Sequence, residues 1–434
     1  MTTLLLGPVL SFRGVSETAS WKVSALIGIK KQAAQPDLKL NGKSVQAPIV
    51  LLEHDGIVYL RYDLSCKQTN EERKVEYTID GVEERWHFTV PGKGYAPRMA
   101  YVSCNGFSDP SGIRKLVKSE NEVWGDLLCN HDKAVRPESY QLDKEQLWHE
   151  HRTHDKELQR FHLLLMGGDQ IYFDSIWEDI KQLKKWIGLP RSEQLRYPVN
   201  KKLKQEIESY YIKLYSSRWL PKERSPWGAK KKSRDASDSM ARMPTVMMWD
   251  DHDIFDGWGS YSAEMQHDAG RLPELKTRSD VSAKTDTPLY EPIVWSEVLG
   301  SDKLALPLLD KQPGFTFAHA VGPVRLVVAD LRTERSHEQV MGPHTWDSLK
   351  AYLGAVERND RKHPGAGCQH LLFMSSVPVV HPKLSLAEAF LDSFGSDHVL
   401  DSSADDLKDH WTHNDHEGER KRLIDTLINT ARKN

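Results

Sequence analysis

The chain has 434 residues, 39% of them hydrophobic, so it can bury a large core, and domains of roughly 100–200 residues would divide it into about two or three. The formal net charge is only −3, so overall charge recruits neither nucleic acid nor an anionic membrane surface. No run approaches the roughly eighteen apolar residues of a membrane span, and we expect neither a membrane nor a nucleic-acid partner.

The N-terminus and the cysteines indicate the compartment. The run MTTLLLGPVLSFRG has no Lys or Arg before its apolar part and contains a proline, so it makes a poor signal peptide. The four cysteines, Cys66, Cys104, Cys129 and Cys368, show no CxxC spacing, which is typical of free thiols in a reducing compartment. The sequence therefore predicts a cytoplasmic protein.

The first part of the chain is rich in strand signals. Asp55-Gly56 and Asp80-Gly81 each lie between runs rich in Val, Ile, Tyr and Phe, which is the signature of a β-hairpin. Helical periodicity is weak throughout this part. We therefore expect residues 1–95 to form a small N-terminal β-sandwich domain.

From residue 96 onward, short apolar runs alternate with longer helical or irregular segments. Such buried strands with helices between them are typical of an α/β fold whose sheet is covered on both faces. The predicted strands are MAYVS (99–103), HLLLMG (162–167), TVMMW (245–249), VRLVVA (324–329) and HLLFM (370–374), and the predicted helices include 200–219 and 417–433.

Each predicted strand is followed by polar or ionisable residues. These are Cys104-Asn105, Gly168-Asp169, Asp250-Asp251-His252, Asp330 and Ser375-Ser376. Ligands of open α/β sheets bind at the carboxyl ends of the strands, so we expect these groups to converge in one cleft. Converging carboxylates repel one another unless a multivalent cation compensates them, and the pattern therefore predicts a metal centre.

Two stretches carry the candidate ligands. In LLLMGGDQIYFD, Asp169 can bridge two cations and Tyr172 can point to the same site; a phenolate together with the thiolate of Cys104 suits ferric iron better than magnesium. In WDDHDIFDGWGS, Asp251 is a candidate ligand and His252 a candidate proton donor.

Structural alternatives exist for both stretches. Asp169 could cap a helix while Tyr172 packs in the core, and the second stretch could be an Asp-rich turn with an exposed histidine. In the functional interpretation, Asp250 or Asp253 orients the ring of His252 without itself contacting the substrate.

The motifs YVSCN, GGDQIY, MMWDDHDIFDGWGS, VVADLRTERS and SSVPVV resemble the alkaline phosphatase D (PhoD-like) family of metallophosphoesterases over roughly residues 98–420. The resemblance implies a four-layer α/β/β/α metallophosphoesterase domain over residues 96–434, behind the β-sandwich. It also implies hydrolysis of small phosphomonoesters or phosphodiesters at a metal cluster. Fe3+ with Ca2+ is the metal content implied, with Zn2+, Mn2+ or Mg2+ as substitutes.

The resemblance assigns roles residue by residue. Cys104 resembles the thiolate ligand to iron, Asp169 the bridging aspartate and Tyr172 the phenolate ligand. Asp251 stands where most of the superfamily has an asparagine. His252 matches the histidine that protonates the leaving group, while the cations bind phosphate oxygens and activate water.

Further residues are tentative substrate-binding or supporting residues: Asn105, Asp250, Asp253, Arg332, Ser376 and Asp409. Arg332 and Arg335 could clamp phosphate, although ion pairs with Asp330 or Glu334 are an equal alternative. Ser376 falls where the wider superfamily often has a ligating histidine.

Two further motifs are weaker candidates. CNHDK (129–133) mimics a superfamily motif, but it follows a helical stretch, and we regard it as a decoy. In DHWTHNDHEGER (409–420), Asp409 resembles a metal-proximal residue of the family, whereas the histidines His410, His413 and His416 favour local structure over ligation.

The family resemblance also implies a last core strand ending in Gly-Asp-Val-His after the helix at 417–433, and no such motif follows that helix in this sequence. We therefore expect a fragment or a decayed site, with sub-stoichiometric metal and weak hydrolysis; replacement of the lost ligands by His410, His413 or His416 is the alternative. A non-catalytic protein that binds a phosphorylated ligand is the alternative from another class. A serine hydrolase is a weaker one, because Ser375-Ser376 lacks a Gly-x-Ser-x-Gly elbow. The oligomeric state stays open.

Overall fold

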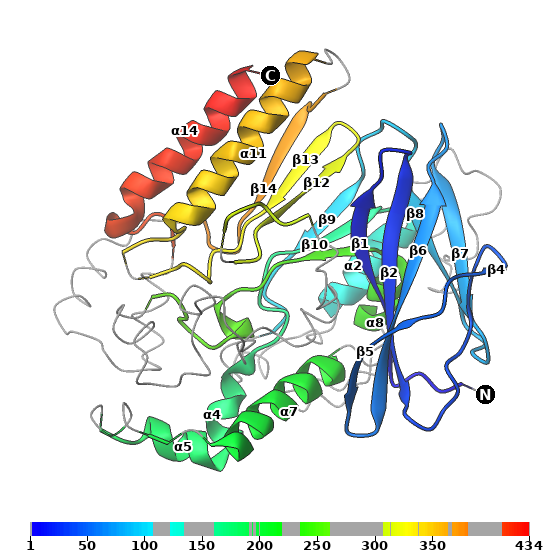
Figure 1. Ribbon diagram of the computed structural model, residues 1–434, viewed down its shortest axis with the longest axis horizontal. Helices are drawn as coiled ribbons and strands as arrows, with labels where there is room; N and C mark the ends of the chain where they lie inside the picture. The colour runs from blue at the N-terminus through cyan, green and yellow to red at the C-terminus, as the bar shows by residue number, and fades with distance from the viewer. Residues whose placement is uncertain are drawn as a thin grey trace.

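The computed structural model describes most of the chain (Figure 1). The described residues are 2–106, 122–133, 160–190, 193, 197–198, 200–218, 235–260, 307–312, 314–336, 338–362, 367–380 and 410–433. They form a mixed α/β structure of several sheets and helices, which confirms the α/β class, while the four-layer α/β/β/α arrangement stays a prediction.

The largest sheet has seven strands in the order β5-β6-β2-β1-β11-β10-β9. Their bounds are β1 (Leu6–Val15), β2 (Ser20–Lys30), β5 (Ile49–His54), β6 (Ile57–Lys67), β9 (Met99–Val102), β10 (Leu163–Met166) and β11 (Thr245–Met247). β9, β10 and β11 are parallel, and β1 joins them through the parallel pair Ser11 and Thr245. One sheet therefore crosses the predicted domain boundary at residue 95, and the division into two domains stays a prediction.

Two smaller sheets complete the described β structure. One has the order β4-β3-β7-β8, with β3 (Leu38–Leu40), β4 (Lys43–Ser44), β7 (Arg73–Ile79) and β8 (Arg85–Val90). The other has the order β12-β13-β14, with β12 (Phe317–Val321), β13 (Val324–Val328) and β14 (His370–Met374). All five strands predicted after residue 96 are thus confirmed, as β9, β10, β11, β13 and β14.

The hairpin predicted at Asp55-Gly56 is also confirmed. β5 and β6 are antiparallel, with His54 opposite Ile57. Asp55 and Gly56, which lie between them, therefore form a two-residue turn. Their φ angles are +46° and +74°, and aspartate and glycine are among the residues that tolerate this left-handed conformation best.

The described helices flank the sheets. They are α2 (Glu122–Lys133), α4 (Ile176–Asp179), α5 (Lys181–Ile187), α7 (Lys201–Arg218), α8 (Asp235–Arg242), α11 (Pro343–Lys362) and α14 (Glu417–Lys433). Three 3-10 helices are η3 (Phe173–Ser175), η4 (Asp251–Asp253) and η7 (Asn414–His416). α7 and α14 confirm the helices predicted at 200–219 and 417–433. None of these helices combines the length and apolar composition that a membrane crossing requires.

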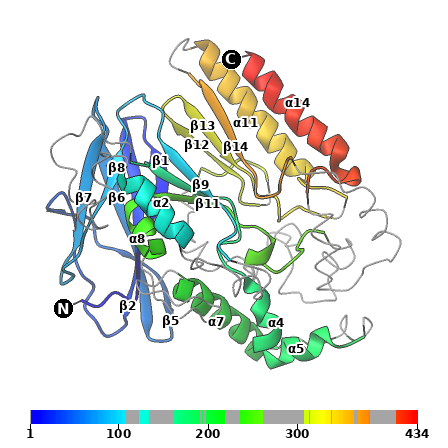
Figure 2. The ribbon, with the colours of Figure 1, turned by 180° about the vertical axis from the view of Figure 1, so that it is seen from behind.

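Apolar side chains pack in successive layers, because neighbouring residues of a strand point to opposite faces. Leu165 belongs to the core that also contains Val328 of the three-stranded sheet, while Leu164 packs toward Met240 of α8. On the other sheet, Val327 packs toward Trp346 of α11. Figures 1 and 2 show α11 and α14 outside the three-stranded sheet, and α2 and α8 outside the seven-stranded sheet.

This covering explains the sequence pattern of the site-bearing strands. β10 is buried at all four positions, since both faces of its sheet are covered. Full burial of one such aliphatic side chain contributes about 1.5–3 kcal/mol. Burial of the strands therefore fixes the positions of their carboxyl ends, which carry the predicted site residues.

Candidate metal centre and active site

Three buried carboxylates converge at the ends of two adjacent parallel strands. Asp169 follows β10, and Asp250 and Asp251 follow β11; one oxygen of each lies within 4.8 Å of the others. The residues are only 5%, 6% and 8% exposed, respectively. The convergence expected from the strand ends is therefore observed for these three side chains.

Backbone conformation at the strand ends brings the chains into close approach. Cys104 and Asp169 both have positive φ angles, +59° and +52°, a conformation that is uncommon for residues other than glycine and that clusters at functional sites. A Cβ at Gly168 would lie 2.4 Å from Cβ of Asp250, so only glycine fits between the two strands here. The amide of Asn105 donates to the carbonyl of Asp169 at 2.8 Å, which ties the first two strand ends together.

Asp169 has a carboxylate oxygen that the described protein does not satisfy. Its Oδ1 is buried and accepts no hydrogen bond from the described residues. Burial first, and then the charges of Asp251 and Asp250, raise the pKa of Asp169 well above its usual value. A bound cation would satisfy this oxygen and relieve the repulsion, so the donor set fits a metal ion.

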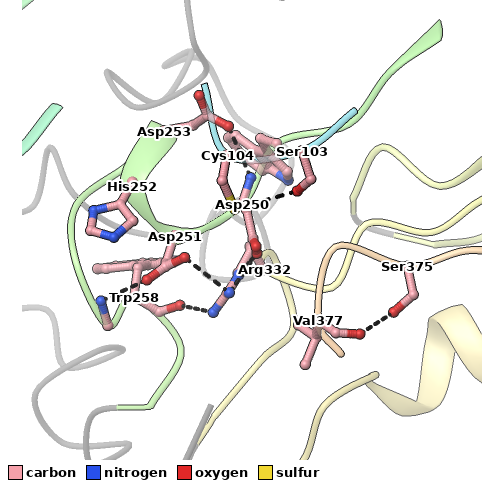
Figure 3. Close-up of polar contacts among 12 residues, drawn as sticks. Ser103, Cys104, Asp250, Asp251, His252, Asp253, Trp258, Arg332, Ser375 and Val377 are labelled. Carbon is pink, nitrogen blue, oxygen red and sulfur yellow. Dashed lines mark hydrogen bonds and ion pairs between the residues drawn. The ribbon is translucent and has the colours of Figure 1, made fainter. Parts of the chain in front are cut away.

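Arg332 supplies positive charge to the same cluster. Its guanidinium contacts the carboxylate of Asp250, donates to Oδ1 of Asp251 at 3.1 Å and donates to the carbonyl of Trp258 at 2.8 Å (Figure 3). The residue is 1% exposed. The guanidinium thus pairs with Asp250 and Asp251, which were not among the ion-pair partners named from the sequence, and Asp330 accepts from the backbone N–H of Arg332.

Asp253 supports the backbone of the site. It is fully buried, and its carboxylate accepts from the amides of Ile171 and Asp250, both at 3.0 Å, and from the hydroxyl of Tyr215 on α7 at 3.2 Å. Burial raises the pKa of Asp253 to about 7, although the two amide hydrogen bonds oppose the shift. This side chain thus joins the loops that follow β10 and β11.

His252 is held by a carboxylate that sequence reasoning missed. Its Nδ1 lies 2.6 Å from Oδ2 of Asp174, and its ring centroid lies 4.3 Å from that of Tyr172. Asp174 thus takes the supporting position that was expected for Asp250 or Asp253. Burial lowers the pKa of His252, but the hydrogen bond to Asp174 and the nearby charge of Asp251 outweigh it and raise the pKa to about 11. The surrounding carboxylates therefore favour the protonated form of the ring.

Cys104 and Tyr172 lie beside the carboxylates. Cys104 as a residue is exposed, yet desolvation of its sulfur, followed by the charge of Asp169, raises the thiol pKa to about 12. Burial, Asp169 and Cys104 raise the pKa of Tyr172 far above its usual value. Both groups are protonated unless a cation lies close to them, so a thiolate and a phenolate here require a metal.

Comparison with known proteins identifies the family. The family model described as "PhoD related phosphatase" matches residues 136–399. The chain belongs to the PhoD-related phosphatase family. Its sequence is also similar to the Saccharomyces cerevisiae protein described as "Uncharacterized protein YGR266W", with 25% identity over 445 residues. That match covers 93% of this chain and 58% of the yeast protein, so the chain spans little more than half of its relative's length.

The remaining candidates in this PhoD-related chain divide into supporting and unplaced residues. Asn105 donates to the carbonyl of Gln170 at 3.1 Å and so supports the Asp169 loop. Ser376 follows β14. Its neighbour Ser375 donates to the carbonyl of Val377 at 2.6 Å (Figure 3). Asp409 lies outside the described residues.

The motifs given less weight have local roles in the PhoD-related chain. His131 of the CNHDK decoy lies on α2, and its Nδ1 accepts from the amide of Phe161 at 3.1 Å. His410 lies 2.7 Å from the hydroxyl of Thr412 through Nδ1, and His416 contacts the carbonyl of His410 at 3.1 Å through Nδ1. These contacts support the prediction of local structure.

Proposed function

We propose that this PhoD-related chain is a metal-dependent phosphoesterase that hydrolyses phosphomonoesters or phosphodiesters, within a four-layer α/β/β/α domain. The family supports a phosphatase, and one observation supports the metal dependence most strongly. It is the buried, unsatisfied Oδ1 of Asp169 within a group of three carboxylates. Such a group is costly without a cation and is the donor set that hard cations select.

The chain offers two kinds of ligand at this site. Asp169, Asp250 and Asp251 supply oxygen ligands that suit Ca2+, Mg2+ or Mn2+. Cys104 and Tyr172 supply a thiolate and a phenolate on the same side as Asp169, which suits Fe3+. A bound cation at such a site neutralises phosphate charge and lowers the pKa of water.

His252 provides the proton for the leaving group. Its Nδ1 is engaged by Asp174, so Nε2 is the nitrogen available to a substrate oxygen. The hydrogen bond to Asp174 favours the protonated form of the ring. Arg332 holds Asp250 and Asp251 in place and is too buried to clamp a phosphate group itself.

The test combines metal analysis with phosphoester kinetics on residues 1–434. His252→Ala should keep its metal but lose about 10²–10⁴-fold in turnover on an alkyl phosphate, whose leaving group needs a proton. The loss should be much smaller on p-nitrophenyl phosphate. His344→Ala, an exposed histidine at the start of α11, is the matched control.

Two outcomes would contradict the proposal. If His252→Ala and the parent turn over the alkyl phosphate equally fast, His252 is not the general acid. Tight binding of phosphate with no turnover under Fe3+, Ca2+, Zn2+, Mn2+ or Mg2+ would instead support the non-catalytic alternative.

A further inference from the structure

Asp174 connects the two loops that carry the candidate site. It lies on η3, two residues after Tyr172, and is the last residue of the stretch LLLMGGDQIYFD, in which no role was predicted for it. Its Oδ2 lies 2.6 Å from Nδ1 of His252, and its Oδ1 accepts the backbone N–H of Asp256 at 2.5 Å. Both oxygens of one carboxylate are therefore committed to the loop after β11.

The ring of His252 is restrained on several sides. The ring of Tyr172 lies against it at 4.3 Å between centroids with an interplanar angle of 35°, and Oδ1 of Asp256 lies 3.6 Å from Nε2. The side chain of His252 is 12% exposed, so one small part of the ring reaches solvent. With Nδ1 bonded to Asp174, a reacting group can meet the ring only through Nε2.

We propose that Asp174 is a positioning residue that fixes the orientation of His252, with Nε2–H directed to the leaving-group oxygen. This inference rests on the proposed phosphoesterase activity. A carboxylate that accepts from one imidazole nitrogen sets the ring orientation and the tautomer presented by the other nitrogen. The amide of Asp256 holds Asp174 in turn, so the acceptor is in place before substrate arrives.

A nearby carboxylate provides a matched comparison. Asp179, at the end of α4, accepts from the hydroxyl of Tyr210 at 2.8 Å. It lies five residues further along the same segment and has no described contact with His252. Replacing Asp179 changes charge in the same region while leaving the hydrogen bond to the ring intact.

The kinetic test compares Asp174→Ala, Asp174→Glu and Asp179→Asn on substrates with good and poor leaving groups. Loss of a carboxylate that supports a functional histidine typically costs about 10–100-fold in activity. We expect Asp174→Ala to lose this factor in kcat on an alkyl phosphate, with KM nearly unchanged and a much smaller loss on p-nitrophenyl phosphate. Asp174→Glu should recover part of the loss, and Asp179→Asn should match the parent.

A second measurement does not depend on activity. In protein with 15N-labelled histidine, the Nδ1–H proton of His252, assigned with His252→Ala, should be shifted downfield and exchange slowly in the parent and in Asp179→Asn. Asp174→Ala should lose this signal. If the parent has no phosphoesterase activity but shows the signal, the proposed function fails while the pairing stands. The positioning role is overturned if Asp174→Ala keeps either the signal or the parent's turnover on the alkyl phosphate.

Discussion

Arg332→Met removes the buried guanidinium that compensates Asp250 and Asp251 while keeping most of the aliphatic stem. Arg332 is 1% exposed, and its side chain contacts both carboxylates and the carbonyl of Trp258. Removing one partner of a buried ion pair costs about 3–5 kcal/mol, because the remaining charge is left uncompensated. A chain of 434 residues loses about 1 °C of melting temperature per kcal/mol, so the melting temperature of the metal-free variant should fall by roughly 3–5 °C.

A cation should reduce this difference, since it compensates the same carboxylates. Ligand present at 100 times its Kd stabilises a folded protein by about 2.7 kcal/mol. Thermal unfolding with and without added Ca2+ should therefore show a larger upward shift for Arg332→Met than for the parent. Arg358→Met, at an exposed position of α11, is the control and should change stability by less than about 0.5 kcal/mol. A metal-free Arg332→Met that melts within about 2 °C of the parent would refute the reasoning.

Other predictions address pH, metal identity and backbone conformation. Burial, and then the charge of a neighbouring arginine, lower the pKa of His319 to about 3. Below pH 6.5 the unfolded chain therefore binds a proton at this histidine that the folded protein does not bind, and the free energy of unfolding decreases as the pH falls. Between pH 7 and pH 5 the parent should therefore lose about 2 kcal/mol more than His319→Phe in denaturant titrations, and equal losses would contradict the assignment. If Tyr172 binds Fe3+, the purified protein should be coloured by phenolate-to-iron charge transfer and Tyr172→Phe should be colourless; an active, iron-free parent would exclude iron. Gly168→Ala should lose metal and at least about 1–3 kcal/mol of stability, because the new Cβ would lie 2.4 Å from Cβ of Asp250. The control Gly418→Ala, whose Cβ would meet nothing within 4 Å, should retain metal binding. A Gly168→Ala variant that binds metal like the parent would contradict the close approach.

The sequence by itself predicted the elements whose pattern is local. The apolar runs at β10 and β11, the helix at 417–433 and the turn at Asp55-Gly56 depend on residues close together in the chain, and all are observed. The grouping of Asp169 with Asp250 and Asp251 followed from one general rule, that adjacent parallel strands present their carboxyl ends at the same edge. Local periodicity and strand polarity therefore located the centre of the site.

The tertiary structure decided which groups surround that centre. Asp174 and His252 are 78 residues apart, and Arg332 and Asp250 are 82 apart. Asp174 and Arg332 both lie in motifs quoted from the sequence, but their neighbours in the chain do not indicate that Asp174 supports His252 or that Arg332 pairs with Asp250. Likewise, β1 joins β11 across 234 residues, between Ser11 and Thr245, so no local signal could show that the N-terminal strands extend the same sheet. Residues this far apart in the sequence come into contact only when the packed sheets bring their loops together. Packing of the whole core, and not the sequence of any one segment, therefore determines these contacts.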